Sequence, residues 1–333
     1  MMTIIFIEKL HGVNYHRLVV PFLRMRDQGQ INLHVVTDAF ELLDFNLDHV
    51  DNFVVSRTIY ARIQGMKIFE KRLKDAGVKF IVDLDDYWEV RKSNPVWKHW
   101  QGYDGFGNAI KRTVRAADEI WTPNPRLAKE IKMQLNPHAE IRIVPNAINP
   151  NEQQWQGEKV TGEHLWFGYT GASSHMEDVQ LVKHIDWSKH KTVAVRMKDA
   201  FYDEFFQTEL TYDPMSVFEY GEMYRRMNVS LVPLKDNKFN RMKSSLKMIE
   251  AGFTRTAVIA SDVYPYNEIV INGETGILCS TPEEWTEAIN GMTKERAKQL
   301  GDNLYEAVRH DYHIDKVNEE RLKGLNHAIS NVQ

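Results

Sequence analysis

Residues 243–276 read KSSLKMIEAGFTRTAVIASDVYPYNEIVINGETG, and this stretch decides the fold prediction. A helix start rich in lysine and serine is followed by Glu250, a β-branched run at Ala257–Ala260 and a turn at Asn272–Gly273. In a parallel α/β domain, helix amino termini and the carboxyl ends of strands line the ligand crevice. Free N–H groups and lysines there suit a diphosphate, and a carboxylate further along the helix suits ribose hydroxyls. The stretch therefore predicts a parallel α/β domain with a nucleotide-sugar site.

The same alternation of short apolar runs and amphipathic segments extends outward over the whole chain. We expect strands at residues 3–7, 31–37, 53–56, 78–82, 119–122, 141–144, 165–169, 192–196, 229–233 and 257–261. We expect helices at residues 15–26, 60–76, 107–117, 124–135, 176–184, 215–227, 243–252, 282–290, 294–309 and 315–330. Strands separated by helix-length segments indicate βαβ units and parallel sheets.

A polar segment without periodicity, residues 147–164, divides this pattern and is predicted to be a linker. It separates an N-terminal domain, residues 1–146, from a C-terminal domain, residues 165–310. The predicted fold class is α/β, with two Rossmann-like, doubly wound domains that face a cleft. Residues 311–333 are expected to form a closing helix, for which packing back on the N-terminal domain is one option.

Composition narrows the classes of function. With 333 residues, 43% hydrophobic and 26% charged, the chain can form two cores and is not mainly disordered. A formal net charge of -4 excludes a global basic field for nucleic acid or anionic lipid, although Lys111, Arg112 and Arg115 leave a local contact open. The single Cys279 excludes an internal disulfide framework. With no membrane-spanning run and no signal-peptide core, we expect a cytoplasmic protein.

Several short motifs occur in a particular order. They are Gly12-Val13, ADEIWT at 117–122, RIVPNAI at 142–148, FGYTG at 167–171, and the block from Glu250-Ala251-Gly252 to Gly273-Glu274-Thr275-Gly276. Together they resemble a GT-B glycosyltransferase of the "group 1" or GT4 type over nearly the whole chain. The motif DLDD at 83–86 resembles a subgroup found in bacteria and bacteriophages.

This resemblance implies an enzyme, a hexosyl- or pentosyltransferase that uses a UDP- or GDP-sugar and a hydroxyl acceptor. It implies retention of anomeric configuration, without a metal and without a cofactor beyond the nucleotide-sugar. The acceptor is open between a glycan, a lipid-linked sugar, a protein and a modified base in phage DNA. The chain departs from the family in two places. Met242 stands where the first of two glutamates is expected, and Ser173 and His175 stand where an arginine and a lysine usually follow the first donor-domain strand. An epimerase of the same architecture and an inactive nucleotide-sugar-binding protein are therefore kept as alternatives.

Candidate donor-site residues cluster around the two ends of the C-terminal pattern. Lys243, Glu250 and His175 are the catalytic candidates. The donor-binding candidates, which share a place at a helix start or a strand end, are Gly171, Arg196, Ser244, Ser245, Lys247 and Glu250. An ordinary helix start with solvated lysines and a capping serine would look the same in sequence. We favour diphosphate binding, because two lysines four residues apart repel each other unless an anion compensates them.

Acceptor candidates lie in the N-terminal half. They are Gly12, Asp85, Asp86 and Trp88. Three aspartates at 83, 85 and 86 also allow a metal site, but the resemblance argues against one, and our prediction is that no metal binds. Aromatic residues near this motif form either a stacking platform or core, and one nearby histidine is expected to orient the acceptor: Trp88, Trp97, Trp100 and Tyr103, with His11, His16 and His99.

Overall fold

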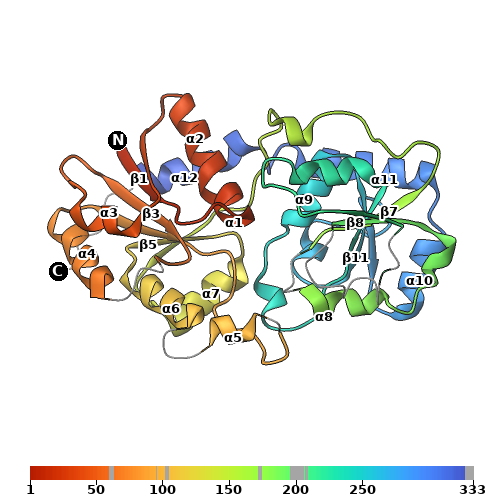
Figure 1. Cartoon of the computed structure of the whole chain (residues 1–333), viewed down its shortest axis with the longest axis horizontal. Helices are drawn as coiled ribbons and strands as arrows, with labels where there is room; N and C mark the ends of the chain where they lie inside the picture. Colours follow the sequence, from red (N-terminus) through yellow and green to blue (C-terminus); the bar gives the residue numbers. More distant parts are fainter. Residues whose placement is uncertain are drawn as a thin grey trace.

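The computed structural model of the chain has two α/β lobes that lie side by side (Figure 1). It describes residues 1–59, 64–94, 96–101, 105–171, 175–195, 206 and 209–326. Each lobe contains one six-stranded sheet in which every pair of neighbouring strands is parallel. The predicted fold class, two Rossmann-like domains, is confirmed.

The N-terminal sheet has the strand order β2-β1-β3-β4-β5-β6. Its strands are β1 Met2–Phe6, β2 Asn32–Val36, β3 Asn52–Ser56, β4 Lys79–Asp83, β5 Glu119–Thr122 and β6 Glu140–Ile143. Because β1 is flanked by β2 on one side and β3 on the other, the chain leaves these strands in opposite directions. A crevice therefore opens at the carboxyl ends of β1 and β3.

The C-terminal sheet has the order β12-β11-β10-β7-β8-β9. Its strands are β7 Trp166–Tyr169, β8 Lys191–Val195, β9 Leu210–Tyr212, β10 Val229–Val232, β11 Ala257–Ser261 and β12 Ile277–Cys279. The reversal of strand order falls between β7 and β10, which places the second crevice at the ends of these two strands.

Helices cover both sheets. Those of the N-terminal lobe are α1 Gly12–Asn14, the π-helical η1 Tyr15–Val19, α2 Val20–Asp27, α3 Ala39–Asp44, α4 Gln64–Asp75, α5 Trp97–Trp100, α6 Phe106–Ala116 and α7 Pro125–Gln134. The later ones are α8 Met176–Val179, the 3-10 helices η7 Tyr220–Arg226 and η8 Asn240–Met242, α9 Leu246–Phe253, α10 Pro282–Asn290, α11 Lys294–Val308 and α12 Ile314–Asn326.

Three expected helices differ from the structure. The helix expected from Lys243 begins only at Leu246, after the turn η8, so Lys243 lies on an extended segment. The helix expected at 215–227 is the 3-10 helix Tyr220–Arg226, and the one expected at 176–184 is a short α8 followed by a 3-10 turn, Gln180–Val182. Strands β9 and β12, only three residues each, have too few residues for a pattern and were not expected.

The C-terminal helix α12 lies beside α2 of the N-terminal lobe (Figure 1). Arg24 forms an ion pair with Asp315 at 2.7 Å, and the side-chain amide of Asn318 donates to the carbonyl of Pro21 at 3.1 Å. Apolar side chains of α12 complete a core with Ile5, Ile81 and Trp121. The chain therefore crosses back from the C-terminal lobe and holds the two lobes in a defined arrangement.

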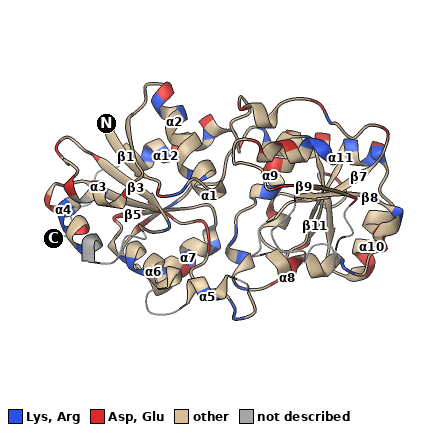
Figure 2. Cartoon of the chain, viewed as in Figure 1, with Lys and Arg blue, Asp and Glu red and all other residues tan. Residues whose placement is uncertain are grey.

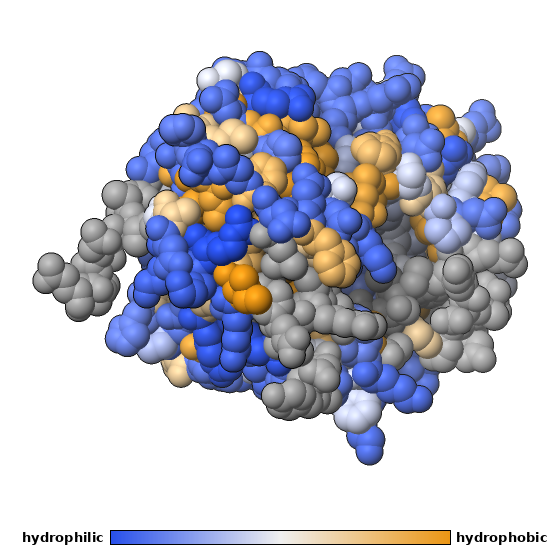
Figure 3. All heavy atoms as spheres, turned by 60° about the vertical axis from the view of Figure 1, so that its left-hand side comes forward, coloured by the Kyte–Doolittle hydropathy of each residue, from blue (hydrophilic) through white to orange (hydrophobic). Residues whose placement is uncertain are grey.

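The surface of the N-terminal lobe that comes forward in Figure 3 is mostly hydrophilic, with apolar side chains in smaller groups. Phe40 and Ile68 are among the exposed apolar residues of this lobe. Within the described part of the chain, no helix has the length and apolar character to cross a bilayer.

Candidate active site between the two domains

A segment of the C-terminal domain docks against the N-terminal domain beside the second crevice. Phe239 and Met242 pack into the N-terminal hydrophobic core, and Phe239 contacts the ring of Trp100 edge-on. The side-chain amide of Asn124 donates to the carbonyls of Arg241 and Lys243, at 3.0 Å and 2.8 Å. The missing family glutamate is thus replaced by a buried methionine in a domain contact. These contacts place the residues around Lys243 at the interface.

Two lysines lie close together at the crevice between β7 and α9. The Lys247 ammonium lies 5.2 Å from the ring centre of Tyr169, and the Lys243 ammonium lies 4.7 Å from that of Phe239. The Nζ atom of Lys247 is buried and makes no hydrogen bond within the described residues. Burial and the charge of Lys243 lower the pKa of Lys247 to about 8. A buried cation without an acceptor is costly, so this arrangement favours an anion as ligand.

His175 stands beside these lysines and is held by a carboxylate. Its Nδ1 atom lies 2.8 Å from Oδ2 of Asp178, and Oδ1 of the same carboxylate accepts from the amide of Lys235 and from the side-chain amide of Asn240. Burial, together with the neighbouring lysines, lowers the pKa of His175 to about 3. The ring is therefore neutral at pH 7. With Nδ1–H directed to Asp178, Nε2 is left as a hydrogen-bond acceptor.

Glu250 connects the donor side to the N-terminal domain. It is 2% exposed, and its Oε2 accepts a hydrogen bond from the hydroxyl of Tyr224 at 2.7 Å. Its Oε1 lies 3.6 Å from Nε2 of His16, which comes from η1 of the N-terminal domain. Burial raises the pKa of Glu250 to about 7, although Tyr224 and Lys247 act in the opposite direction. Burial also lowers the pKa of His16 to about 4. At pH 7 the carboxyl group of Glu250 is therefore about half ionised, and the neighbouring imidazole of His16 is neutral.

The remaining donor candidates have protein partners or tight packing. Ser244 Oγ accepts from the side chain of Asn146 at 2.7 Å, across the domain interface, and Ser245 Oγ donates to the carbonyl of Pro265 at 3.2 Å instead of capping α9. A Cβ on Gly171 would collide with the Tyr169 hydroxyl, so any other residue there would have to displace the tyrosine side chain. Arg196 falls outside the described residues.

A separate pocket of about 370 Å³ opens on the N-terminal domain at the carboxyl ends of β1 and β3. It lies at the first crevice, where strand order predicts a ligand. Residues from the ends of both strands and an aromatic wall from α5 and α6 line it: Phe6, Glu8, Lys9, His11, Asn14, Val55, Ser56, Arg57, Thr58, His99, Trp100 and Phe106.

Asp85 and Asp86 do not line this pocket, but both form ion pairs with Arg57, which does. Arg57 donates through Nε and Nη2 to Asp85, at 2.7 Å and 3.0 Å, and through Nη2 to Asp86 at 2.6 Å. The two carboxylates and the other charges nearby hold the pKa of Arg57 above its usual value, against the opposing effect of burial. Sequence reasoning missed Arg57, because it follows a different strand and belongs to no motif. Among the described residues, no three His, Cys, Asp or Glu side chains are arranged to hold a metal ion.

The other two acceptor candidates, Gly12 and Trp88, do not line the pocket either. Trp88 is 1% exposed, packs against Tyr87 at 4.4 Å between ring centres and belongs to the N-terminal core. Its proposed acceptor contact is therefore corrected to a core role, because apolar neighbours enclose the indole. Gly12 begins α1 between the pocket residues His11 and Asn14, with open space around the position of a Cβ. Tyr103 lies outside the described residues.

Comparison with known proteins bears on the donor half. Residues 215–295 match the family model for glycosyl transferases group 1, and they contain η7, α9 and β11. The resemblance to group 1 glycosyl transferases is thereby confirmed. A segment of 97 residues is 32% identical to a lipopolysaccharide core biosynthesis mannosyltransferase, LpcC, of Rhizobium leguminosarum bv. viciae. That segment covers 28% of this chain and only 26% of LpcC, about a quarter of the relative's length.

Several solved structures share the architecture at low sequence identity. Sucrose-phosphate synthase from Thermosynechococcus elongatus gives a TM-score of 0.68 at 13% identity, covering 96% of this chain and 97% of that one. A glycosyltransferase from Rickettsia africae gives 0.64 at 11% identity, with 99% of both chains covered. Anabaena HepE, solved in complex with UDP, gives 0.62 at 10% identity, covering 97% and 99%. These likenesses establish the GT-B fold.

Proposed function

We propose that the protein is a glycosyltransferase that moves a sugar from a nucleotide-diphosphate-sugar to a hydroxyl acceptor. The observation that carries the proposal is the convergence of Lys243, Lys247, His175 and Glu250 at the crevice between the domains. The buried Lys247 ammonium without a hydrogen-bond acceptor among the described residues supports an anionic ligand. The match of residues 215–295 to group 1 glycosyl transferases supports the same class of reaction.

On this proposal, the donor diphosphate lies between Lys243 and Lys247, with backbone near Gly171 in contact. Glu250 accepts hydrogen bonds from ribose hydroxyls through Oε1, since Tyr224 already occupies Oε2. The base is that of a UDP- or GDP-sugar. HepE, a structural neighbour, was solved with UDP, and that fact supports a uridine nucleotide for this chain as well.

The chemistry follows from where charge develops. As the bond between the sugar and the diphosphate breaks, negative charge grows on the leaving oxygen. Cations held in place there stabilise the transition state more than the ground state. Neutral His175 offers Nε2 as an acceptor to a sugar hydroxyl rather than acting as a cation. We propose retention of configuration, with the acceptor attacking from the leaving-group side and without a metal ion.

The pocket on the N-terminal domain gives the transferase an acceptor site. An epimerase would convert the sugar on its own nucleotide and would need no second pocket. The pocket of about 370 Å³ at the β1 and β3 ends therefore favours transfer to a separate molecule. A glycan, a lipid-linked sugar, a protein side chain and a modified DNA base are the acceptors considered.

A donor screen tests the proposal. Release of nucleoside diphosphate is measured across UDP-, GDP- and ADP-sugars, and release of CMP across CMP-sugars, in the presence of acceptor mixtures. The expected result is turnover with a UDP- or GDP-sugar and a loss of at least about tenfold in kcat/KM for Lys243→Ala. The control is Lys189→Ala, a 71% exposed lysine paired with Asp186 on the other side of the C-terminal domain. If no donor binds and none turns over, the proposal is wrong.

A further inference from the structure

Two buried asparagines of the N-terminal domain contact the segment of the C-terminal domain that leads into α9. Asn124 lies shortly after β5 and Asn146 shortly after β6, and they are 1% and 3% exposed. The side-chain amide of Asn124 donates to the carbonyl of Lys243 at 2.8 Å. That of Asn146 donates to Oγ of Ser244 at 2.7 Å. The N-terminal domain therefore holds two consecutive residues of the proposed diphosphate site.

The orientation of the Asn146 side chain is set by Arg17. Its Oδ1 accepts from Nη1 of Arg17 at 3.2 Å, and a guanidinium can only donate. The nitrogen of the amide is therefore the atom that faces Ser244, whose Oγ accepts this hydrogen bond. The proton of the same hydroxyl has no acceptor among the described residues. Ser244 is thus left with its proton free to donate to a ligand.

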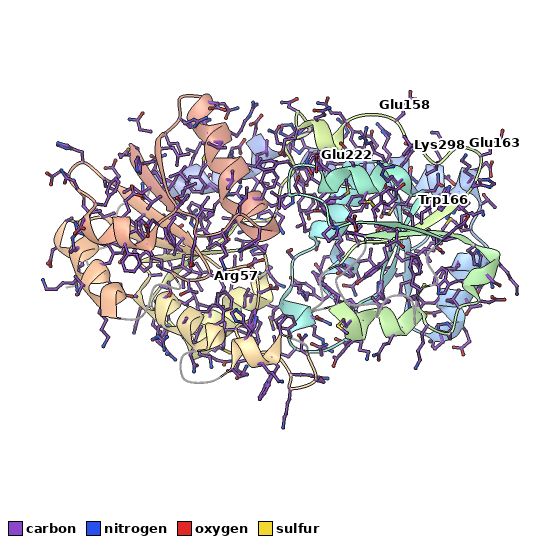
Figure 4. All side chains as sticks on the ribbon, viewed as in Figure 1. Arg57, Glu158, Glu163, Trp166, Glu222 and Lys298 are labelled. Atoms are coloured by element: carbon purple, nitrogen blue, oxygen red, sulfur yellow. The ribbon has the colours of Figure 1, made fainter. Side chains whose placement is uncertain are left out.

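Arg17 is itself held firmly. It is 1% exposed and donates through Nε and Nη2 to the carboxylate of Asp83, at 2.8 Å and 2.7 Å, while Nη1 also donates to the carbonyl of Val144 at 2.7 Å. The carbonyl of Asp83 accepts from the amide of Arg57, which Figure 4 places on the side of its domain that faces the other lobe. A buried bidentate ion pair with all three guanidinium nitrogens engaged has one geometry, so Arg17 keeps Asn146 in one orientation.

The helix that carries Arg17 also reaches the other end of the proposed donor site. Arg17 belongs to the π-helical η1, a kind of turn that is frequent at functional sites. Nε2 of the preceding residue, His16, lies 3.6 Å from Oε1 of Glu250, the proposed ribose ligand. Two consecutive residues of η1 therefore serve the proposed ribose side directly and the proposed phosphate side through Asn146.

Precisely placed groups matter here because overall charge does not attract an anion to this protein. The formal net charge is -4, and Figure 2 shows basic and acidic residues interspersed on both lobes. Binding of a diphosphate therefore depends on a few groups held at the crevice rather than on a broad basic surface. Lys243 and Lys247 supply charge there, and the hydroxyl of Ser244 adds a neutral donor next to Lys243 in the chain.

We propose that Asn146 is a positioning residue for the transferase: held by Arg17, it fixes the Ser244 hydroxyl as a hydrogen-bond donor to the diphosphate of the bound nucleotide-sugar. This inference rests on the proposed function, because it names how that donor site is completed. It assigns part of the donor site to the N-terminal domain. Tight binding of the diphosphate then requires the two domains to be docked.

Asn146→Asp tests the orientation. The carboxylate keeps the size of the side chain and still accepts from Arg17, but it cannot donate, so the Ser244 hydroxyl must turn its proton toward it. The surroundings tolerate the new charge, because the buried guanidinium groups of Arg17 and Arg321 face the single carboxylate of Asp83. UDP and uridine affinities are measured by calorimetry and NMR titration at pH 7.5. We expect UDP affinity to fall about tenfold or more and uridine affinity to stay unchanged, because only UDP carries the diphosphate.

A double-mutant cycle separates orientation from charge. Ser244→Ala removes the hydroxyl and should weaken UDP binding about tenfold by itself. In that background Asn146→Asp should cost less than about threefold, because there is no hydroxyl left to turn, whereas direct repulsion of the diphosphate by the new carboxylate would persist. Asn146→Ala is an uncharged second test. It should weaken UDP binding about threefold or more in the wild type and cause no further loss in Ser244→Ala.

The matched control is Tyr264→Phe at the same interface. It removes the hydrogen bond from the Tyr264 hydroxyl to Oδ1 of Asn124 at 3.2 Å, and Oδ1 of Asn124 keeps the amides of the first turn of α7. Both UDP and uridine affinities should be unchanged in this variant. Loss of an interdomain hydrogen bond is thereby distinguished from loss of the Ser244 orientation.

The outcomes separate this inference from the proposed function. Unchanged UDP affinity in the Asn146 variants, an equal loss of UDP and uridine affinity, or a full loss in the Ser244→Ala background would each overturn the positioning role and leave the transferase standing. If the wild type binds no nucleotide at all, the proposed function and this inference are both wrong.

Discussion

Replacing Glu250 by glutamine tests the electrostatics on which the donor site depends. Glu250 is 2% exposed, and burial raises its pKa from an ordinary 4.5 to about 7. The folded state thus binds this proton more tightly than the unfolded state does. The contribution to stability is fully present below pH 4.5 and is lost as the pH rises through 7. At 1.36 kcal/mol per unit of pKa, the loss is about 3 kcal/mol.

Glutamine keeps the size of the side chain and can still accept from Tyr224, but it does not titrate. At pH 5, Glu250→Gln should therefore be about as stable as the wild type. At pH 8 it should be more stable by about 3 kcal/mol, because the wild type then carries a buried charge. The variant should at the same time lose donor affinity, since the ionised carboxylate is the group proposed to hold ribose.

The assay is urea unfolding at pH 5, 6, 7 and 8, followed by circular dichroism and by tryptophan fluorescence, whose coincidence checks two-state behaviour. The quantity to compare is the difference in free energy of unfolding between Glu250→Gln and the wild type at each pH. His16, whose pKa is lowered to about 4 by burial, contributes stability above its ordinary 6.5 that is lost as the pH falls through 4. This opposite slope is common to both proteins and cancels. If the difference in free energy of unfolding between the two proteins changes by less than about 0.5 kcal/mol from pH 5 to pH 8, the reasoning is refuted.

Three further predictions address neighbouring residues. Lys247→Met should raise the melting temperature of the free protein, because it removes a buried cation without an acceptor among the described residues, and it should weaken UDP binding about tenfold or more in calorimetry. The control is Lys298→Met, at an exposed lysine. Unchanged UDP affinity in Lys247→Met would contradict the assignment. Met242→Glu should destabilise the protein by about 3 kcal/mol in urea without raising activity, because it buries a carboxylate in the N-terminal core; a more active variant would show that the position still serves the donor. Tyr224→Phe should raise the pKa of Glu250, since it removes the hydrogen bond that lowers it. If UDP binding needs ionised Glu250, UDP affinity measured from pH 8.5 down to pH 6 should begin to fall at a higher pH in the variant than in the wild type. An unchanged midpoint pH of UDP affinity would exclude ionised Glu250 from donor binding.

Sequence patterns predicted a strand or helix correctly where its conformation depends on its own residues. The strand at 257–261 and the helix at 282–290 were predicted with the bounds that the structure has. The strand is a continuous β-branched and small apolar run, which a buried parallel strand requires. The helix begins with Thr281, Pro282 and Glu284, a capping box that satisfies its first amides. The alternation of such elements was sufficient to predict two parallel α/β domains.

Local signals failed where a distant segment competes. Lys243 was expected on a helix, but its carbonyl and that of Arg241 accept from Asn124 of the N-terminal domain, while Met242 packs into that domain's core. These contacts hold residues 240–243 in a 3-10 turn that ends at an extended Lys243, so the helix starts later. Trp88 was expected at the acceptor because of its neighbours in sequence, but packing of the core decides its place.

By itself the sequence determined the class of fold and its division into two parallel sheets, because hydrophobic periodicity and helix caps are encoded in adjacent residues; its donor-side candidates remain predictions. Only the tertiary structure decided which polar side chains meet. Arg57 reaches Asp85 and Asp86 because β3 and β4 are paired in the sheet, and His16 reaches Glu250 because α12 and the Phe239–Met242 contact bring the lobes together. Such pairings depend on the register of strands and the packing of domains, and no local pattern records them.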